Sequence, residues 1–166
     1  MISKKGVSGI LATVIMIALV IGLVAVVWAS INSLVNKEIA STESCFGNFG
    51  KVSLNKQYTC KNSANGEMQI SLEVKDITIT GILVSISGQS GSKSMEIKNS
   101  SSYAYAKMFG GTYGQVLGLP EKNSGLTYVI SLSSLGISDG DSIKIAPIIN
   151  DNQCEVSDSL SEIFAC

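Results

Sequence analysis

The sequence lacks two of the residue types on which many binding and catalytic sites depend. All twelve basic residues are lysines, and the 166 residues include no histidine. The absence of arginine argues against nucleic acid as a partner, because nucleic-acid recognition relies heavily on arginine forks and basic patches. The absence of histidine removes the commonest general base and metal ligand. No Ser-His, Cys-His or paired-carboxylate constellation is visible either, so we expect no enzyme activity, no cofactor and no metal.

Charge of either sign is also scarce. Charged residues make up 15% of the chain and the net charge is −1, whereas serine and threonine total 33. A surface built from hydroxyls, amides and glycine, with few ion pairs, fits an extracellular wall or fibre protein better than a cytosolic enzyme.

A long apolar segment dominates the N-terminus. The 31 residues from Gly6 to Asn36 carry no charge and directly follow Lys4 and Lys5. Within them, Thr13 is the only hydroxyl or amide side chain between Ile10 and Ala29. Such a helix needs a bilayer or a sleeve of similar helices around it. At 1.5 Å per residue it spans about 46 Å, compared with roughly 30 Å of bilayer hydrocarbon.

Two ordinary interpretations of this segment leave something unexplained. A secretory signal has an apolar region of about 7–15 residues followed by a small-residue cleavage site. Here the region is longer, and the only passable site, residues 27–29, has a bulky tryptophan in its middle. A simple signal anchor keeps the lysines cytoplasmic and the following domain outside. It explains the segment but not its excess length.

The residues around the start of the segment resemble the processing site of archaeal type IV pilins and archaellins. The pattern is Lys4-Lys5-Gly6, followed by Val7 and the apolar helix. The resemblance covers about 25 residues and implies that a prepilin peptidase cuts between Gly6 and Val7. Residues 1–6 are then a leader peptide, residues 7–44 the N-terminal helix, and residues 45–166 an extracellular head. Bacterial pilins carry glutamate at the fifth mature position, which is Leu11 here; archaeal members often lack it.

The resemblance implies a function. The subunit is expected to wait in the cytoplasmic membrane as a single-pass protein, and the pilus assembly machinery then builds it into a cell-surface filament used for adhesion. Its main partner is itself, through a homopolymer of N-terminal helices. Two alternatives stay open. One is a membrane-anchored extracellular binding module, and the other is an archaellin, the subunit of a motility filament.

Small residues follow one another along one side of the predicted helix. Ala18, Gly22, Ala25 and Ala29 are separated by four, three and four positions, which places them on one helical face. Small residues at this spacing let the backbones of neighbouring helices approach closely. Membrane helices are rich in glycine and alanine in any case, so the face is a prediction of helix packing and not proof of it.

After Cys45 the pattern changes to that of β-strands. Apolar and polar residues alternate over 68–74, and the phase switches near Asp76 and again at Gly81, which indicates a turn or bulge and a second bend. Further strands are expected at 51–54, 95–98, 126–132 and 142–149, with turns at 88–94, 110–114, 120–125 and 138–141. Together these predict an α+β protein in which a long apolar helix is followed by an antiparallel β-sandwich or barrel. The resemblance to type IV pilins implies the same arrangement.

The four cysteines, Cys45, Cys60, Cys154 and Cys166, all follow the apolar segment. An even number in the exported part predicts two disulfides in an oxidising compartment. Spacing allows three pairings, and we expect the local one, Cys45 with Cys60 and Cys154 with Cys166. The alternative considered joins Cys45 to Cys166 and Cys60 to Cys154. Zinc is disfavoured because there is no C-x-x-C pair and no histidine.

Three further features are candidate sites. Asn99-Ser100-Ser101 is the only glycosylation sequon in the chain. Asp139-Gly140-Asp141 suggests calcium but lacks the other ligands of an EF-hand loop, so a turn before a strand is the preferred interpretation. An aromatic-rich stretch is expected to pack in the head, with a subunit contact as the alternative; it consists of Tyr103, Tyr105, Phe109 and Tyr113.

Overall fold

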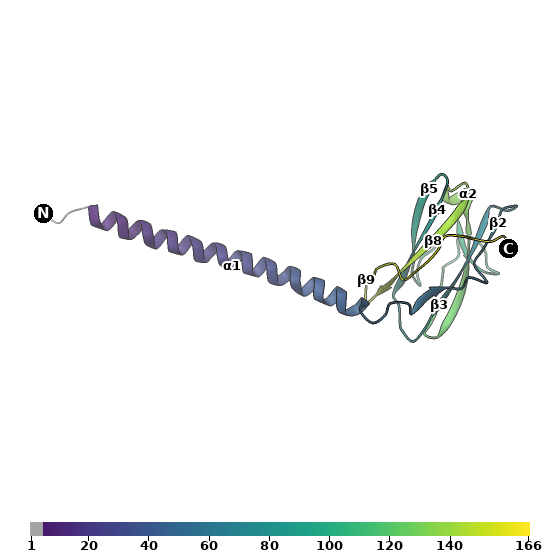
Figure 1. Ribbon diagram of the computed structural model, residues 1–166, viewed down its shortest axis with the longest axis horizontal. Coiled ribbons are helices and arrows are strands. Elements are labelled where there is room, and N and C mark those ends of the chain that lie inside the picture. The colour runs from purple at the N-terminus through teal and green to yellow at the C-terminus, as the bar shows by residue number, and fades with distance from the viewer. Residues whose placement is uncertain (1–4) are drawn as a thin grey trace. The chain divides into compact units, whose positions relative to one another are not determined.

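The computed structural model describes the chain over residues 5–166, with side chains over 9–36 and 45–166. The chain divides after Ala40 into two compact units, and each is described by itself. The expected fold class is confirmed at this level, because an apolar N-terminal helix is followed by antiparallel sheets (Figure 1).

The first unit is the helix α1, which spans Lys5–Cys45 and whose last residues belong to the second unit. Its sequence contains no proline, so nothing interrupts the backbone hydrogen bonds. Apolar residues occur all around it, which is typical of a helix surrounded by lipid or by other helices. The hydroxyls of Thr13 and Ser30 donate to the carbonyls of Ile10 and Val26 at 2.9 and 3.0 Å. These two polar groups are therefore satisfied within the helix.

The second unit is the head, which contains two five-stranded sheets. The first sheet comprises β1 (Val52–Leu54), β2 (Cys60–Asn62), β3 (Glu67–Val74), β6 (Ala106–Met108) and β7 (Ser124–Ser131). The second comprises β4 (Gly81–Gly88), β5 (Gly91–Ile97), β8 (Gly140–Ile149), β9 (Asn152–Gln153) and β10 (Asp158–Leu160). All pairings between these strands are antiparallel.

The strand order shows which edges of the two sheets lie next to each other. The first sheet runs β1-β3-β7-β6 and the second runs β10-β8-β4-β5. β2 pairs with β3 beyond the end of β1, and β9 pairs with β8 beyond the end of β10. The sheets meet where β1 and β10 lie side by side, because Leu54 N donates to Asp158 Oδ2 at 2.9 Å and Ser157 Oγ donates to the Val52 carbonyl at 2.8 Å.

One continuous apolar core fills the space between the sheets. β3 contributes Met68, Ile70, Leu72 and Val74 from the first sheet, and β4 contributes Ile82, Val84 and Ile86 from the second. Their period of two reflects the alternation of side chains across a pleated strand. Tyr128 is fully buried in this core, and its hydroxyl donates to the Gly118 carbonyl at 2.6 Å. Burial raises the pKa of this phenol.

Several expected strands are confirmed, and some boundaries were wrong. The ranges 51–54, 68–74, 126–132 and 142–149 correspond to β1, β3, β7 and β8. The phase switch after Val74 is an irregular connection over 75–80, from which Ile77 and Ile79 still enter the core. The expected turn at 88–94 is shorter, because β5 already begins at Gly91 and pairs with β4. β7 and β8 likewise begin inside the turns expected at 120–125 and 138–141.

Five short elements were not expected from the sequence. They are β2, β6, β9, β10 and the helix α2 (Leu132–Leu135). Each spans at most four residues, too few to show a hydrophobic period. α2 is set by its ends, since the Ser131 hydroxyl accepts from Ser134 N and Gly136 adopts φ 80° as its C-cap.

Candidate functional site: assembly surfaces of the helix and the head

The surface of α1 is the largest apolar feature of the chain. Gly9–Asn36 is 28 residues long with a mean hydropathy of 3.1, which is long and apolar enough to cross a membrane. Every side chain in this range is exposed within the chain's own structure. Exposed apolar patches on soluble monomers rarely exceed a few hundred Å². This surface must therefore be covered by something outside the single chain.

The small residues of α1 lie on one side of the helix, as the spacing predicted. At 100° per residue, Ala18, Gly22, Ala25 and Ala29 fall within about 60° of arc. A Cβ built on Gly22 meets nothing within 4 Å, so glycine is not required there by packing within the chain. The bulky side chains of Ile15, Leu19 and Val26 are exposed around this face. Its role in helix packing stays a prediction.

The predicted cleavage site lies at the start of the described chain. Lys4 is outside the described residues, and Lys5, Gly6 and Val7 form the first turn of α1. Cleavage between Gly6 and Val7 therefore stays a prediction.

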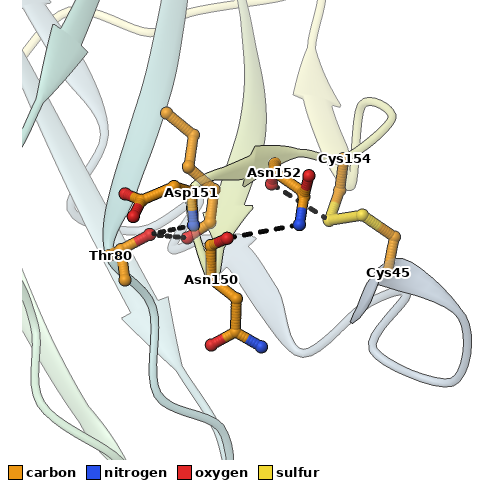
Figure 2. The surroundings of a disulfide bond; sticks show 7 residues. Cys45, Thr80, Asn150, Asp151, Asn152 and Cys154 are labelled. Atoms are coloured by element: carbon orange, nitrogen blue, oxygen red, sulfur yellow. Dashed lines mark hydrogen bonds between the residues drawn. A yellow bond between two sulfur atoms is a disulfide. The ribbon is translucent and has the colours of Figure 1, made fainter. Parts of the chain in front are cut away.

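The base of the head is organised around the disulfide that joins Cys45 to Cys154 (Figure 2). Cys154 follows β9, which is joined to β8 by the two-residue loop Asn150-Asp151. Both loop residues have positive φ, 51° and 61°, as the hairpin turn that matches strand twist requires. The Thr80 hydroxyl accepts from Asp151 N at 3.2 Å and donates to the Ile148 carbonyl at 3.1 Å. This hairpin places Cys154 beside the last residue of α1.

The expected disulfide pairing was wrong. The structure joins Cys45 to Cys154 and Cys60 to Cys166, which is neither the local pairing nor the alternative considered. The local pairing fails because β2 carries Cys60 away from Cys45 along β3, where Cys60 faces Gln69. The C-terminal tail returns to this same edge, and a parallel bridge joins Ala165 to Lys61. Tertiary pairing therefore brings together cysteines that are 109 and 106 residues apart in sequence.

An apolar hollow of about 480 Å³ lies beside the Cys45–Cys154 bond. Its lining includes Phe46, Phe49, Pro147 and Ile149. Pro147 and Ile149 belong to the well-buried end of β8, whereas Phe46 and Phe49 remain 83% and 76% exposed. Sequence reasoning missed this hollow, because two phenylalanines separated by glycine and asparagine show no period. The one available signal was their position directly after Cys45.

The opposite end of β8 carries a cluster around Lys61. Lys61 Nζ lies 3.0 Å from Asp139 Oδ1 and 3.9 Å from Asp141 Oδ1. The sequence interpretation of residues 139–141 as a turn before a strand agrees with this arrangement, since β8 begins at Gly140. Among the residues whose side chains the structure describes, no group of three potential metal ligands comes together. The two carboxylates act here as partners of a lysine within the same head.

The aromatic-rich stretch divides into a packed part, Tyr103 and Tyr105, and an exposed part, Phe109 and Tyr113. Tyr103 and Tyr105 pack against the core and stack with ring centroids 5.2 Å apart. The Tyr113 hydroxyl donates to Glu67 Oε1 at 2.5 Å, and Lys107 Nζ lies 3.3 Å from that oxygen and 4.3 Å from the Tyr113 ring centre. The Tyr113 hydrogen bond, together with the smaller effect of Lys107, lowers the pKa of Glu67. Burial and the bond to Glu67 raise the pKa of Tyr113.

The sequon residue Asn99 is exposed in a turn after β5. Its Oδ1 accepts from Leu119 N at 2.8 Å, and the Ser101 hydroxyl accepts from Lys98 N at 3.0 Å. Exposure is what a modified asparagine needs, but glycosylation of Asn99 stays a prediction.

Comparison with protein-family models, with curated proteins and with solved structures found no match. The chain's own surfaces are an apolar helix that no other described part of the chain covers and a disulfide-tied head with an apolar hollow beside the Cys45–Cys154 bond.

Proposed function

We propose that this chain is the structural subunit of an extracellular filament similar to archaeal type IV pili, and that it polymerises through α1. The observation that carries the proposal is the exposure of every side chain over Gly9–Asn36. In the filament, helices from many copies cover this surface by forming a continuous apolar core. Before assembly, lipid covers the same surface and holds the subunit in the membrane.

The dimensions and chemistry of α1 suit both surroundings. Its 28-residue apolar stretch measures about 42 Å along the axis, which exceeds the hydrocarbon thickness by roughly 12 Å. The hydroxyls of Thr13 and Ser30 are already bonded to backbone carbonyls, so they lose no partner when lipid is replaced by protein. Transfer from bilayer to bundle is then nearly balanced for the bulk of the surface. Close packing along the small-residue face and contacts between heads favour the bundle.

The head supports an extracellular location. Its two disulfides are of the kind that forms in oxidising compartments. We propose that the heads form the outer shell of the filament and that the repeat is head-to-tail and unclosed, which produces a fibre and not a ring. Adhesion is the proposed role of this fibre, with a motility filament as the second candidate within the same class.

The test combines the mature N-terminus with the physical state of the protein. Cell-surface material is sheared, purified by sedimentation, and analysed by mass spectrometry and electron microscopy. The proposal expects fibres whose subunits begin at Val7 and retain α1. Subunits that begin at Met1 and occur only as detergent-extracted monomers would instead indicate a membrane-anchored binding module. A soluble β-rich product without α1 would exclude both functions.

A further inference from the structure

The head presents two unlike apolar features at its two ends. The hollow lined by Phe46, Phe49, Pro147 and Ile149 lies at the end of β8 that is marked by Ile149. Phe164 lies by Lys61, whose partner Asp139 directly precedes the first residue of β8. A strand of this length measures roughly 30 Å. One end of the head is therefore hollowed, and the other carries an exposed phenyl ring.

Phe164 is exposed and yet held by a rigid tail. Phe164 is 71% exposed and lies two residues before Cys166, the last residue of the sequence. Lys61 N donates to the Phe164 carbonyl at 2.8 Å, and Cys166 N donates to the Lys61 carbonyl at 3.0 Å. The Cys60–Cys166 disulfide fixes the same segment. An aromatic side chain on a backbone that is already ordered loses less conformational freedom when it binds.

Resting on the filament function proposed above, we propose that Phe164 of one subunit inserts into the hollow between Phe46 and Phe49 of the next. The partner is thus a second copy of this chain. Because the two surfaces differ and lie at opposite ends of the head, each contact leaves one hollow and one phenyl ring free. Such a heterologous contact repeats head-to-tail and produces an open fibre when its rotation does not close a ring. The hollow, at about 480 Å³, falls within the size range of pockets that bind small organic molecules, so it has room for a phenyl ring.

Lipid is the less suitable occupant of the hollow, because the lining also includes the polar residues Asn48, Gln153 and Glu155, whose side chains are costly to place in hydrocarbon.

The first test maps the contact directly. The photo-crosslinking analogue p-benzoylphenylalanine replaces Phe164 in the full chain, and sheared filaments are irradiated, digested and analysed by mass spectrometry. The proposal expects crosslinks from position 164 to the segments 46–49 or 147–155 of another copy. Crosslinks to any other segment, to lipid or to another protein would overturn it, as would intact filaments without any crosslink at this position.

The second test measures the contact's contribution to the filament with a matched control. Phe164→Ala is compared with Tyr58→Ala, because Tyr58 is similarly exposed at 58% but belongs neither to the lining of the hollow nor to the C-terminal tail. At a fixed temperature we expect the fraction of subunits released from F164A filaments to rise about tenfold, corresponding to ~1.4 kcal/mol per contact. Equal release from the F164A and Y58A filaments would overturn the proposal.

A double variant tests whether Phe164 and the hollow act together. F49A is expected to raise release as F164A does, and F49A/F164A is expected to add little to either single change, because both remove the same contact. Additive effects would overturn the proposal. Thermal unfolding of the detergent-solubilised monomers checks folding, and F164A should match the parent protein there. If F164A destabilises the monomer, the crosslinks from position 164 alone decide whether the proposed contact exists. If the parent protein forms no filaments, the proposed function itself fails, which is a separate outcome.

Discussion

At the scale of single residues, the head depends on a few side chains whose partners are distant in sequence. Tyr113 and Lys107 both contact Glu67, across separations of 46 and 40 residues. Their combined effect lowers the pKa of Glu67, with the Tyr113 hydrogen bond as the larger cause. A carboxylate whose pKa falls on folding stabilises the folded state when it is ionised. That stabilisation is present above the unfolded pKa and is lost as the pH falls through the lowered folded value.

Tyr113→Phe should therefore raise the pKa of Glu67 towards its ordinary value and reduce stability near neutral pH. The difference from the parent protein should disappear in acid, where Glu67 is protonated in both proteins. Unfolding by denaturant, measured between acidic and neutral pH, checks this. Tyr103→Phe is the matched control, because the Tyr103 hydroxyl donates to the backbone carbonyl of Glu96, which does not titrate. The stability lost in this variant should therefore be independent of pH. A Tyr113→Phe effect of constant size across the range would contradict the role assigned to Glu67.

Gly88 is a second residue-scale constraint. A Cβ at this position would lie 1.6 Å from the carbonyl oxygen of Asp139, and the register of β4 against β8 shifts between Ser87 and Gly88. Gly88→Ala should therefore destabilise the head by about 2–4 kcal/mol, because backbone must move to admit the methyl group. The neighbouring Ser87→Ala is expected to change stability by less than about 0.5 kcal/mol. Denaturant unfolding of both variants checks the prediction, and equal stabilities would show that β4 shifts without cost.

At the scale of elements, α1 and the strands obey different rules. Strand residues are sorted between the core and the surface, so each strand carries a period of two. No such sorting occurs in α1, because no other element of the described chain covers it. Its faces differ only in the size of their side chains. The small face is therefore the feature from which a direction of helix packing is predicted.

Ala25→Leu, on the small face, is expected to block filament formation or to weaken the filaments strongly. Ala12→Leu is its matched control, since it makes the same chemical change about 110° around the helix from that face. Both alanines are exposed in the single chain, and both variants add equal hydrophobicity to a membrane span. Insertion into the membrane should therefore be unchanged. The yield of sheared filaments, normalised to membrane-bound subunit, measures the difference, and equal yields would remove the small face as the site of close helix packing.

At the scale of the whole head, two interleaved disulfides connect its first and last segments. Cys45 pairs with Cys154, and Cys60, which lies between them, pairs with the final residue Cys166. Each bond closes a loop of more than 100 residues. For loops of this length, loss of unfolded-state entropy stabilises the fold by about 4.7 kcal/mol. The two contributions are not additive, because each loop contains one end of the other.

Non-reducing digestion followed by mass spectrometry should yield peptides joined through Cys45–Cys154 and Cys60–Cys166. Replacement of either pair by serine is expected to cost about 2–5 kcal/mol of head stability. The Cys60→Ser/Cys166→Ser variant should also release the tail that carries Phe164. Peptides joined through any other pair would contradict the strand arrangement at both ends of the head.

Long, strongly patterned segments were predictable from the sequence, because their signal is local. A charge-free run cannot remain exposed to water, and alternation over 68–74 is the direct consequence of a strand with one buried face. The phase break after Val74 was likewise visible, since a change of phase requires a change of direction. The candidate aromatic stretch was recognisable by composition, but which of its rings are buried was not.

The short strands, the disulfide pairing and the surfaces at the two ends of the head were decided only by the tertiary structure. β2, β6, β9 and β10 each have at most three residues and are held by pairing with longer strands, so their own residues are too few to show a period. Loop length favoured local disulfides, yet the pairing follows which sheet edges lie side by side. The contact role proposed for Phe46, Phe49 and Phe164 follows only from where the folded head places them. The local sequence determines which residues must be buried away from water, whereas the packing of the two sheets determines which of these residues contact each other.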